Sequence, residues 1–474
     1  MKYDVVVIGS GLGGLECAYI LSRAGLRVLV LEQGRQPGGC LQSYRRRGLA
    51  YDTGFHYVGG LDEGQPLHTV FTYLGLMQLP WQRLDHEFDK VTIGQRTFAF
   101  AQGYEDFTAT LAAEFPSERP ALGRYAALLR RMSEQELDLL NPRAGKTVWP
   151  SRLVETSAWQ YLNETFRNPL LVDVLSGTSL KMELRRDSLP LFTFLHGQSS
   201  FIESSWRLKG DGALITDRLV RGVGQQGGRD GEVYEGAVFI SDIHPEQTCK
   251  LVKRSERMKN AYRHRMAALP NTFGMFTVSL RMKPQSLEYF NYNRYIYGHS
   301  GVWTFYEDGG PVSGLMASCR VPEDGDRFAS QVDLLTPMTW EKCAVWSGTE
   351  VGRRGGDYEA MKGRVADECI RLAERVMPGL RGWVSECYTS TPLTYRDYTG
   401  APGGTAYGLR KDYRNPLAAL LSVRTPVPNL FLTGQNLMLH GVHGVTMTAL
   451  FTCAEVLGRE RIWNIVTNKK GVEI

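Results

Sequence analysis

The sequence predicts an α/β fold, because the chain opens with an apolar strand, a glycine-rich turn and a helix, and the same order of elements returns near its end. Between these two stretches lie a helix-rich segment and a segment in which apolar and polar residues alternate as in β-strands. We therefore expect a discontinuous Rossmann-like domain with an inserted α+β domain, which contains an antiparallel sheet and a helical cap.

The first strand and turn carry the most specific signal. Residues 5–8 are an unbroken apolar run, typical of a buried parallel strand, and three glycines follow with the spacing G-x-G-x-x-G. The first glycine permits a tight turn, the second lets a pyrophosphate approach the backbone, and the third lets the helix expected over residues 12–24 pack closely. A helix N-terminus also favours phosphate. We expect the turn to bind a dinucleotide through Gly9, Gly11, Leu12, Gly13 and Gly14.

The second strand, expected over residues 27–31, ends in an acidic residue. Glu32 stands about 20 residues beyond the glycines, where a carboxylate can accept hydrogen bonds from both ribose hydroxyls and would repel a 2′-phosphate. Gln33 adjoins it, and the pair Gly38 and Gly39 offers a second place where the backbone can approach a cofactor. These features leave FAD or NAD as the dinucleotide.

Composition narrows the class of protein. A chain of 474 residues predicts roughly two or three interleaved domains. The net charge of +5 is small for this length and we find no recognition motif for DNA or RNA, so we expect no nucleic-acid partner. The eight cysteines include no C-x-x-C pair, which favours a reducing compartment, and no signal peptide precedes the first strand. We therefore expect a cytoplasmic protein.

One run calls for a membrane interpretation. Residues 425–454 contain no Asp, Glu, Lys or Arg and are numerous enough to span a bilayer. The run also holds Asn429, Gln435, Asn436 and two histidines, spaced as a strand, a loop and a helix. We expect it to be buried inside the protein.

The middle of the chain changes texture. The segment from 67 to 205 is rich in helical patterns, for example at residues 133–140 and 159–166, and we interpret it as a cap over a substrate site. A helix expected over residues 213–223 and the strand after it return the chain to the first domain. The connection between them is too short for the strand pair usual in such a domain, so we expect that a segment has been omitted near residues 227–231.

Strand patterns dominate the next part. Residues 271–282 alternate as a strand, and residues 289–297, 303–306 and 314–319 are rich in aromatic or apolar side chains. They predict an antiparallel sheet with one face toward a ligand cavity. An amphipathic helix over residues 358–377 follows.

The last part repeats the nucleotide-binding order. A short apolar strand over residues 428–435 is followed by a glycine-containing loop at 440–444 and a helix over 445–457. An enzyme that uses only NAD has no clear need for a second such element. A flavin does need one, because a helix N-terminus stabilises the pyrimidine edge of its ring on reduction. The sequence therefore favours FAD, with further contacts from Gly434, Gln435, Gly441, Gly444 and Val445.

These elements give a predicted division of the chain. The FAD-binding domain takes residues 1–66, 206–246 and 415–474, and the substrate domain takes residues 67–205, which include the helical cap, and 247–414.

Several motifs together resemble a known group: residues 4–14, Gly38-Gly39, and residues 52–56, 241–245, 389–400 and 432–441. They are similar to the phytoene desaturase superfamily, and within it to the carotenoid isomerase and retinol saturase branch. The resemblance covers nearly the whole chain. Its nucleotide motifs are common to all such flavoproteins, whereas the stretch 389–400 is more particular to this branch.

The resemblance implies a non-covalent FAD, with Glu32 on the adenosine ribose, Gly434 and Gln435 near the pyrophosphate and ribityl chain, and the flavin ring near residues 440–444. It also implies an apolar polyene or isoprenoid substrate that enters a tunnel from a membrane or a carrier, so that peripheral membrane contact is compatible with it. The chain departs from the family in the short segment 228–236.

Flavin chemistry at a carbon–carbon double bond requires a dry cavity and a substrate held against the flavin N5 atom. We expect hydride transfer between N5 and an olefinic or allylic carbon, with protonation of the partner carbon in the saturating direction. The candidate proton donors are His56, His440, His443 and Tyr395. No carboxylate adjoins the two C-terminal histidines in the sequence, so we expect no metal site.

Three functions stay open. The first is a flavin-dependent saturase or desaturase of a lipid. The second is a redox-neutral isomerase that uses reduced flavin and leaves the product mass unchanged. The third is a flavin-free module that escorts prenylated proteins, against which the intact glycines and Glu32 count. We expect no dedicated nicotinamide domain, so NAD(P)H would reach the flavin only transiently, as an electron donor.

Overall fold

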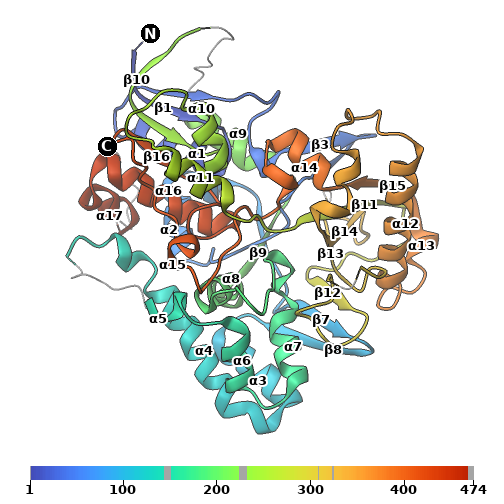
Figure 1. Cartoon of the computed structure of the whole chain (residues 1–474). Coiled ribbons are helices and arrows are strands. Elements are labelled where there is room, and N and C mark those ends of the chain that lie inside the picture. The colour runs from blue at the N-terminus through green and yellow to red at the C-terminus, as the bar shows by residue number, and fades with distance from the viewer. Residues whose placement is uncertain (1, 144–150, 224–231, 308, 323–324, 468–474) are drawn as a thin grey trace.

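A computed structural model describes residues 2–143, 151–223, 232–307, 309–322 and 325–467. The predicted α/β fold is confirmed: a parallel sheet, a larger mixed sheet and a helical layer make up the molecule. Figure 1 shows the parallel sheet near both chain termini, the helical cap below it and the larger sheet on the right. The omission predicted near residues 227–231 lies outside the described residues.

The parallel sheet draws its strands from the beginning, middle and end of the chain. Its order is β16-β10-β1-β2, with β1 at Lys2–Ile8, β2 at Val28–Leu31, β10 at Glu235–Ser241 and β16 at Leu430–Leu432. Val5 and Val7 share one apolar core with the helices α1 (Leu12–Arg23), α9 (Ala213–Val223), α16 (Gly441–Leu457) and α17 (Arg459–Thr467). The helices α10 (Pro245–Leu251) and α11 (Asn260–Ala268) pack beside β10 and β16.

The larger sheet has seven strands in the order β15-β11-β14-β13-β12-β7-β8. Their bounds are Val384–Ser390, Gly274–Met282, Gln331–Met338, Gly314–Cys319, Asn293–Tyr297, Glu87–Ile93 and Arg96–Ala101. All neighbours are antiparallel except β12 and β7, which pair in parallel because β7 and β8 arrive from the cap segment. The predicted antiparallel sheet is therefore a mixed one.

One expected strand is absent from this sheet. Residues 303–306 form a turn, so the prediction that they belong to a strand was wrong. The aromatic side chains there are buried for another reason: Trp303 is 1% exposed and its Nε1 donates to Ser176 Oγ at 2.9 Å. These residues are apolar because they pack against the cap, and not because they form a strand.

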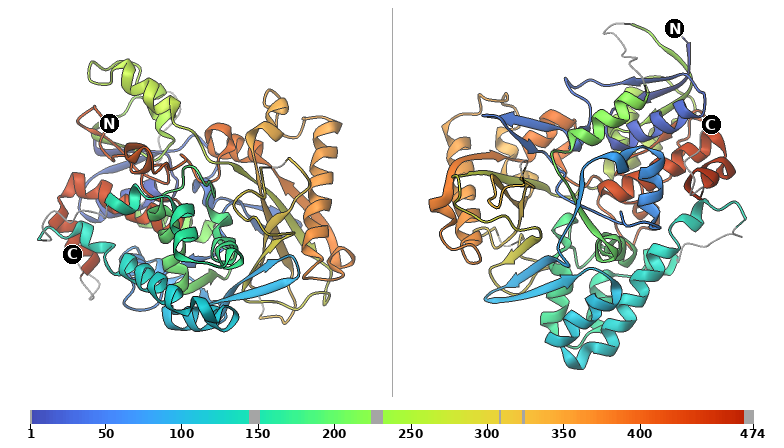
Figure 2. Two further views of the ribbon diagram at one scale, coloured as in Figure 1. Left: turned by 60° about the horizontal axis from the view of Figure 1, so that its bottom comes forward. Right: turned by 180° about the vertical axis from the view of Figure 1, so that it is seen from behind.

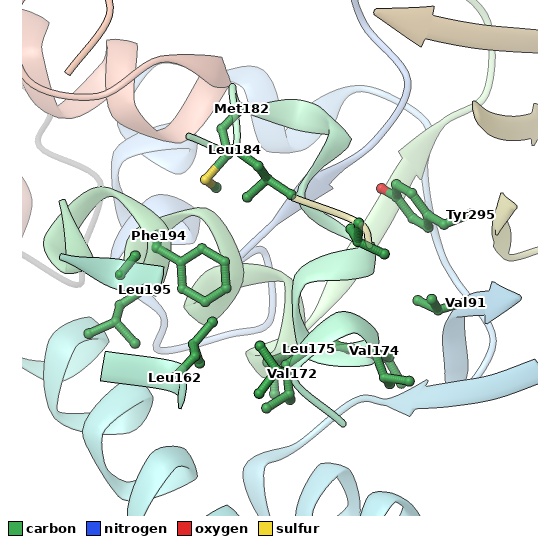
Figure 3. Close-up of a cluster of buried hydrophobic side chains, with 14 of the residues drawn as sticks. Val91, Leu162, Val172, Val174, Leu175, Met182, Leu184, Phe194, Leu195 and Tyr295 are labelled. Carbon is green, nitrogen blue, oxygen red and sulfur yellow. The ribbon is translucent and has the colours of Figure 1, made fainter. Parts of the chain in front are cut away.

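The cap is made of short helices: α3 (Tyr104–Glu114), α4 (Arg119–Glu134), α5 (Ser151–Val154), α6 (Ala158–Thr165), α7 (Pro169–Gly177) and α8 (Leu191–Glu203). The helix predicted over residues 159–166 is confirmed as α6, but the one over 133–140 was wrong. There, α4 ends at Glu134, and a turn leads into the 3-10 helix η4 (Leu137–Leu140). Figure 3 shows how apolar side chains of α6, α7 and α8 meet Val91 of β7 and Tyr295 of β12, which joins the cap to the large sheet.

Smaller elements connect these layers. The strands β3 (Ser43–Arg46) and β4 (Leu49–Asp52) form a hairpin, and β5 (Val58–Gly59), β9 (Ser205–Leu208) and β6 (Trp81–Arg83) form a small sheet. The remaining α-helices are α2 (Pro66–Tyr73), α12 (Gly356–Ala373), α13 (Leu380–Trp383), α14 (Pro392–Thr399) and α15 (Pro416–Ala419), and α12 corresponds to the amphipathic helix predicted over 358–377. Figure 2 shows the same arrangement from two further sides.

The charge-free run near the C-terminus folds as β16, a glycine loop and α16, whose middle is buried. The helix begins at Gly441, so the loop predicted over residues 440–444 was wrong beyond its first residue. Glycine normally disfavours a helix, but Gly444 is required here, because a Cβ at this position would overlap the backbone of Leu439. In the described part of the chain, no helix is both long and apolar enough to cross a membrane.

Candidate cofactor and substrate site

The first glycine turn has the geometry that its spacing predicts. Gly9 adopts φ +94°, which an L side chain rarely tolerates, and its turn leads from β1 into α1. A Cβ at Gly14 would overlap the carbonyl oxygen of Gly9, so the third glycine is needed for the close approach of helix and strand. Leu12 and Gly13 form the first residues of α1, where backbone N–H groups are free of helical partners.

Glu32 ends β2 beside this turn. Its Oε2 accepts from the Ser10 backbone N–H at 2.9 Å and from the Ser10 hydroxyl at 2.5 Å, and its Oε1 accepts from the Gly34 N–H at 2.6 Å. Glu32 and Gln33 are exposed, as a residue that meets a ribose must be. Gly38 and Gly39 begin the 3-10 helix η1 (Gly39–Leu41), and a Cβ at Gly39 would lie 3.3 Å from the Cα of Gly11. The cofactor-binding residues predicted near the N-terminus therefore lie around one turn.

The two ends of the chain meet at the same place. A Cβ at Gly13 would lie 3.1 Å from the Cα of Gly434, which has φ +88°. Behind this contact, Thr446 Oγ1 of α16 donates to Glu16 Oε1 of α1 at 2.7 Å. Gln435 continues the Gly434 loop, and Gly441, Gly444 and Val445 lie in the first turns of α16. The predicted cofactor residues therefore surround one region, and their contact with a cofactor stays a prediction.

A cavity of about 160 Å³ adjoins this region. Its walls are mostly apolar, and come from the chain after β4, from α8, from the face of the large sheet and from the start of α16. Gly441 and Gly444 lie on its wall, which connects it to the second nucleotide element. The apolar lining residues include Phe55, Leu180, Phe201, Met275, Met316, Leu335 and Leu439.

His443 carries the charge on one wall. Its Nε2 lies 2.7 Å from Glu136 Oε2, and the side chains are 16% and 3% exposed. Burial alone would lower the pKa of His443, but the Glu136 carboxylate outweighs it and the pKa is raised. The same contact lowers the pKa of Glu136 against the effect of its burial. No carboxylate adjoins this histidine in the sequence, but one contacts it in the fold, because Glu136 comes from the turn after α4.

The other predicted proton donors have different surroundings. Burial lowers the pKa of His56 to about 3 and of His440 to about 4, so both imidazoles are neutral at neutral pH. His440 Nε2 donates to the Lys181 carbonyl at 2.7 Å. Both histidines line the cavity. Tyr395 is not among its lining residues; its hydroxyl donates to the Thr53 carbonyl at 2.7 Å, and burial raises its pKa.

A second charged group lines the cavity and was missed from the sequence. Lys181 Nζ donates to the Tyr57 hydroxyl at 3.1 Å and lies 3.7 Å from the centre of the Phe201 ring. The Tyr57 hydroxyl donates to Asp89 Oδ2 at 3.0 Å. Because Tyr57 has only one proton to give, the 2.6 Å contact with Tyr295 is a donation from the Tyr295 hydroxyl.

Burial shapes the charges of this network. It lowers the pKa of Lys181 to about 8, which Asp89 partly counters, and it raises the pKa of Asp89 to about 6. No local pattern signals these residues: Lys181 is the last residue of the 3-10 helix η5 (Ser179–Lys181), and Asp89 stands inside a strand. Only the pairing of β7 with β12 brings Asp89 behind the cavity.

Comparison with known proteins agrees with this arrangement. Residues 7–74 match the family model described as NAD(P)-binding Rossmann-like domain. The chain is 26% identical to human all-trans-retinol 13,14-reductase over 97% of its own length and 86% of that protein. It is also 33% identical to the chloroplastic prolycopene isomerase of Arabidopsis thaliana, over 26% of this chain and 21% of that protein. The resemblance predicted from the motifs is confirmed.

Solved structures show the same fold. Putrescine oxidase bound to putrescine matches with a TM-score of 0.65 at 14% identity, over 96% of this chain and 99% of that one. An oxidoreductase from Methanosarcina mazei matches with a TM-score of 0.61 at 17% identity, over 95% of this chain and 99% of that one. The chain therefore shares its fold with these two oxidoreductases.

Proposed function

We propose that this chain is an FAD-dependent oxidoreductase that acts on a carbon–carbon double bond of an apolar isoprenoid or polyene, retinol-like or carotenoid-like. One observation carries the proposal: an apolar cavity that contains a paired histidine opens beside the place where both nucleotide elements meet. Similarity to all-trans-retinol 13,14-reductase over 97% of the chain supports it.

The residues present fit a flavin. Gly9 and Gly14 permit the tight turn and the close packing of α1 against it, because a Cβ at either would meet neighbouring protein atoms, and Glu32 is exposed at the ribose position. When bound, FAD supplies hydride transfer through its N5 atom. Burial raises the pKa of the Cys40 thiol to about 11, so this cysteine is a poor nucleophile, which supports a non-covalent cofactor. The residues that would hold it are Gly9, Gly11, Leu12, Gly13, Gly14, Glu32, Gln33, Gly38, Gly39, Gly434, Gln435, Gly441, Gly444 and Val445.

The cavity walls select the substrate and keep water out. Met275, Met316 and Leu335 on the sheet face Leu439 and Phe201 across the cavity, so an apolar chain finds no competing hydrogen-bond partner along these side chains. Excluding water also strengthens the electrostatic effect of the few charged groups on the walls.

His443 is the residue that we assign as proton donor. Its position in the first turn of α16 would by itself disfavour an imidazolium, because a helix N-terminus is positive. The buried Glu136 carboxylate overcomes this and raises the pKa of His443 above its ordinary value, which favours the protonated ring. His56 and His440 are neutral, and a neutral imidazole is a far weaker acid. His443 can therefore give its proton to the substrate carbon that does not receive hydride.

Electrons come to the flavin from outside the protein. We propose NAD(P)H as a transient donor, and peripheral contact with a membrane as the route by which the apolar substrate arrives. Both proposals rest on the expected substrate and on the resemblance, and both are open to direct assay.

The function is tested with the purified protein and a panel of polyenes, among them retinol and lycopene isomers. Under anaerobic conditions with reduced flavin, we expect a product that gains the mass of two hydrogen atoms, and oxidation of the flavin in equal amount. The variant His443→Gln should still bind FAD but reduce the substrate much more slowly. A colourless protein that binds no added FAD would contradict the proposal.

A second candidate is a redox-neutral isomerase that uses reduced flavin. The specific support is the 33% identity to prolycopene isomerase over 129 residues. In the same assay an isomerase changes the retention time of the substrate but not its mass, and leaves the flavin reduced.

A further inference from the structure

Asp242 occupies a central place in the candidate cofactor site. It directly follows β10, between the glycine turn of β1 and the loop that carries Gly434. A Cβ added at Gly11 would overlap Oδ2 of Asp242, one added at Gly434 would overlap Oδ1, and one added at Gly13 would lie 2.9 Å from Oδ1. These glycines are therefore required by the Asp242 side chain as much as by a cofactor.

The carboxylate lies against Gly11 where a Cβ would stand, and this second glycine is the one whose bare backbone approaches the pyrophosphate in dinucleotide-binding folds. It accepts a hydrogen bond from the Gly14 backbone N–H, one of the free donors at the start of α1. The same helix end supplies the positive potential that favours phosphate. Asp242 and a bound pyrophosphate thus share one region of positive potential.

Among the residues that the structure describes, no cation acts on Asp242. The titratable groups that face it are Glu16 and Cys17 on α1, Cys40 on η1 and Glu32 at the end of β2. Within the described ranges, no lysine or arginine forms an ion pair with it. Burial, and to a smaller extent Glu32, raise the pKa of Asp242 to about 7, against the hydrogen bond from Gly14.

A dianionic pyrophosphate beside this carboxylate adds two further negative charges in a partly desolvated place. Like charges a few ångströms apart favour the protonated form of a carboxyl group. We propose that Asp242 is the neutral acid in the FAD complex, where it donates a hydrogen bond toward the dinucleotide, and that FAD binding takes up one proton at this residue. The inference rests on the flavin site of the proposed function, and is independent of the substrate.

The sign of the pH dependence follows from linkage. If the complex contains one more proton than its separate partners, the affinity for FAD falls as pH rises above the pKa of free Asp242. The decrease approaches about tenfold for each pH unit, because a single proton is involved. Below that pKa the acid is already protonated, and the affinity is flat.

The experiment uses the full chain after removal of its flavin. FAD is titrated by calorimetry in two buffers of different ionisation enthalpy, over a range from about pH 6 to about pH 9. We expect proton uptake near and above neutral pH. Asp242→Asn, whose amide donates like the neutral acid, should bind FAD without proton uptake and with an affinity that stays flat over this range. At the alkaline end it should bind FAD at least tenfold more tightly than the wild type.

Two controls separate this effect from others. Glu32→Gln should weaken FAD binding and keep the slope of the pH dependence, but the fall in affinity should begin at a lower pH, because the Glu32 charge no longer raises the pKa of Asp242. Lys411, which burial gives a pKa of about 7 and which donates to the carbonyls of Asn436 and Leu437, is unchanged in Asp242→Asn, so its contribution is common to both proteins.

The outcomes are distinct. FAD binding by the wild type without proton uptake overturns the inference about Asp242 and leaves the proposed function standing, even if the variant fails to fold. The same holds if Asp242→Asn retains the full pH slope. Absence of FAD binding at any pH overturns both the inference and the proposed function.

Discussion

Two walls of the cavity each pair one cation with one buried carboxylate, and they do so differently. On the α16 wall, His443 contacts Glu136 directly at 2.7 Å, and the pKa of the histidine is raised. On the wall that Lys181 lines, the lysine is connected to Asp89 only through the Tyr57 hydroxyl, and burial lowers the pKa of the lysine to about 8.

The difference shows that contact distance decides whether burial or charge attraction controls a proton. A carboxylate at hydrogen-bond distance more than offsets the cost of desolvating its partner, whereas one placed beyond a bridging hydroxyl offsets only part of it. The first arrangement holds a proton ready at the cavity. The second holds a positive charge in place at a considerable cost, and therefore contributes mainly to the shape and polarity of the wall.

The largest effect is expected from breaking the bridged pair. Lys181→Met leaves Asp89 buried without the cation that acts on it most strongly, and should reduce the free energy of unfolding by about 3–5 kcal/mol. Denaturant unfolding measures the loss. The double variant Lys181→Met with Asp89→Asn removes both charges and should regain at least about 1 kcal/mol. A single variant as stable as the wild type would show that the network carries no such charge.

Breaking the direct pair should act on catalysis. Glu136→Gln removes the carboxylate that raises the pKa of His443, so we expect this pKa to fall below its ordinary value and the rate of substrate reduction to fall about 100-fold at neutral pH. Glu203→Gln is the matched control, because Glu203 acts on His443 only through space and accepts from the Ser133 hydroxyl. Equal rates in the two variants would contradict the role of the direct contact.

The pH dependence of stability should differ between His443, which is paired with Glu136, and the neutral His440. His440 has a pKa of about 4 in the folded protein and 6.5 as its ordinary value, so between these limits the unfolded chain binds the extra proton. Stability that is present above about pH 6.5 is lost as pH falls toward about 4, by about 3 kcal/mol for this residue. His440→Gln should show a smaller acid-dependent loss in denaturant unfolding. His443 has the opposite sign, and contributes stability that is lost as pH rises through its raised pKa.

A smaller loss of stability is expected from removing the Tyr57 hydroxyl that lies between Lys181 and Asp89. Tyr57→Phe removes the hydroxyl that accepts from Lys181 and donates to Asp89, and should cost about 1–2 kcal/mol in the free energy of unfolding. Tyr295→Phe removes only one donor to Tyr57 and should cost less. Equal losses would mean that the bridge is no more important than its neighbour.

Sequence alone located the nucleotide elements because their signals are local. The strand, the glycine spacing and Glu32 fall within the first 32 residues, and each of these signals depends only on the local backbone conformation. The helix over 213–223 was likewise predicted to the residue as α9. The start of α16 was misplaced because Gly441 and Gly444 discourage a helix, and only tertiary contact with Leu439 explains them.

The cavity wall could be predicted only in part. His56, His440 and His443 were chosen by residue type and do converge on the cavity. Glu136 was hidden inside a stretch interpreted as continuous helix, and no sequence pattern links it to a histidine about 300 residues away. A partner that is defined by long-range packing leaves no local trace, and for this reason Tyr395, which fits the family motif, was weighted equally with His443.

The most direct test of this account is a crystal structure of the purified protein with its flavin. We expect density for FAD between the Gly9–Gly14 turn and the first turn of α16, with the edge of the ring on the cavity that His443 and Lys181 line. A flavin ring separated from that cavity by protein, or density for FAD elsewhere in the molecule, would contradict the account.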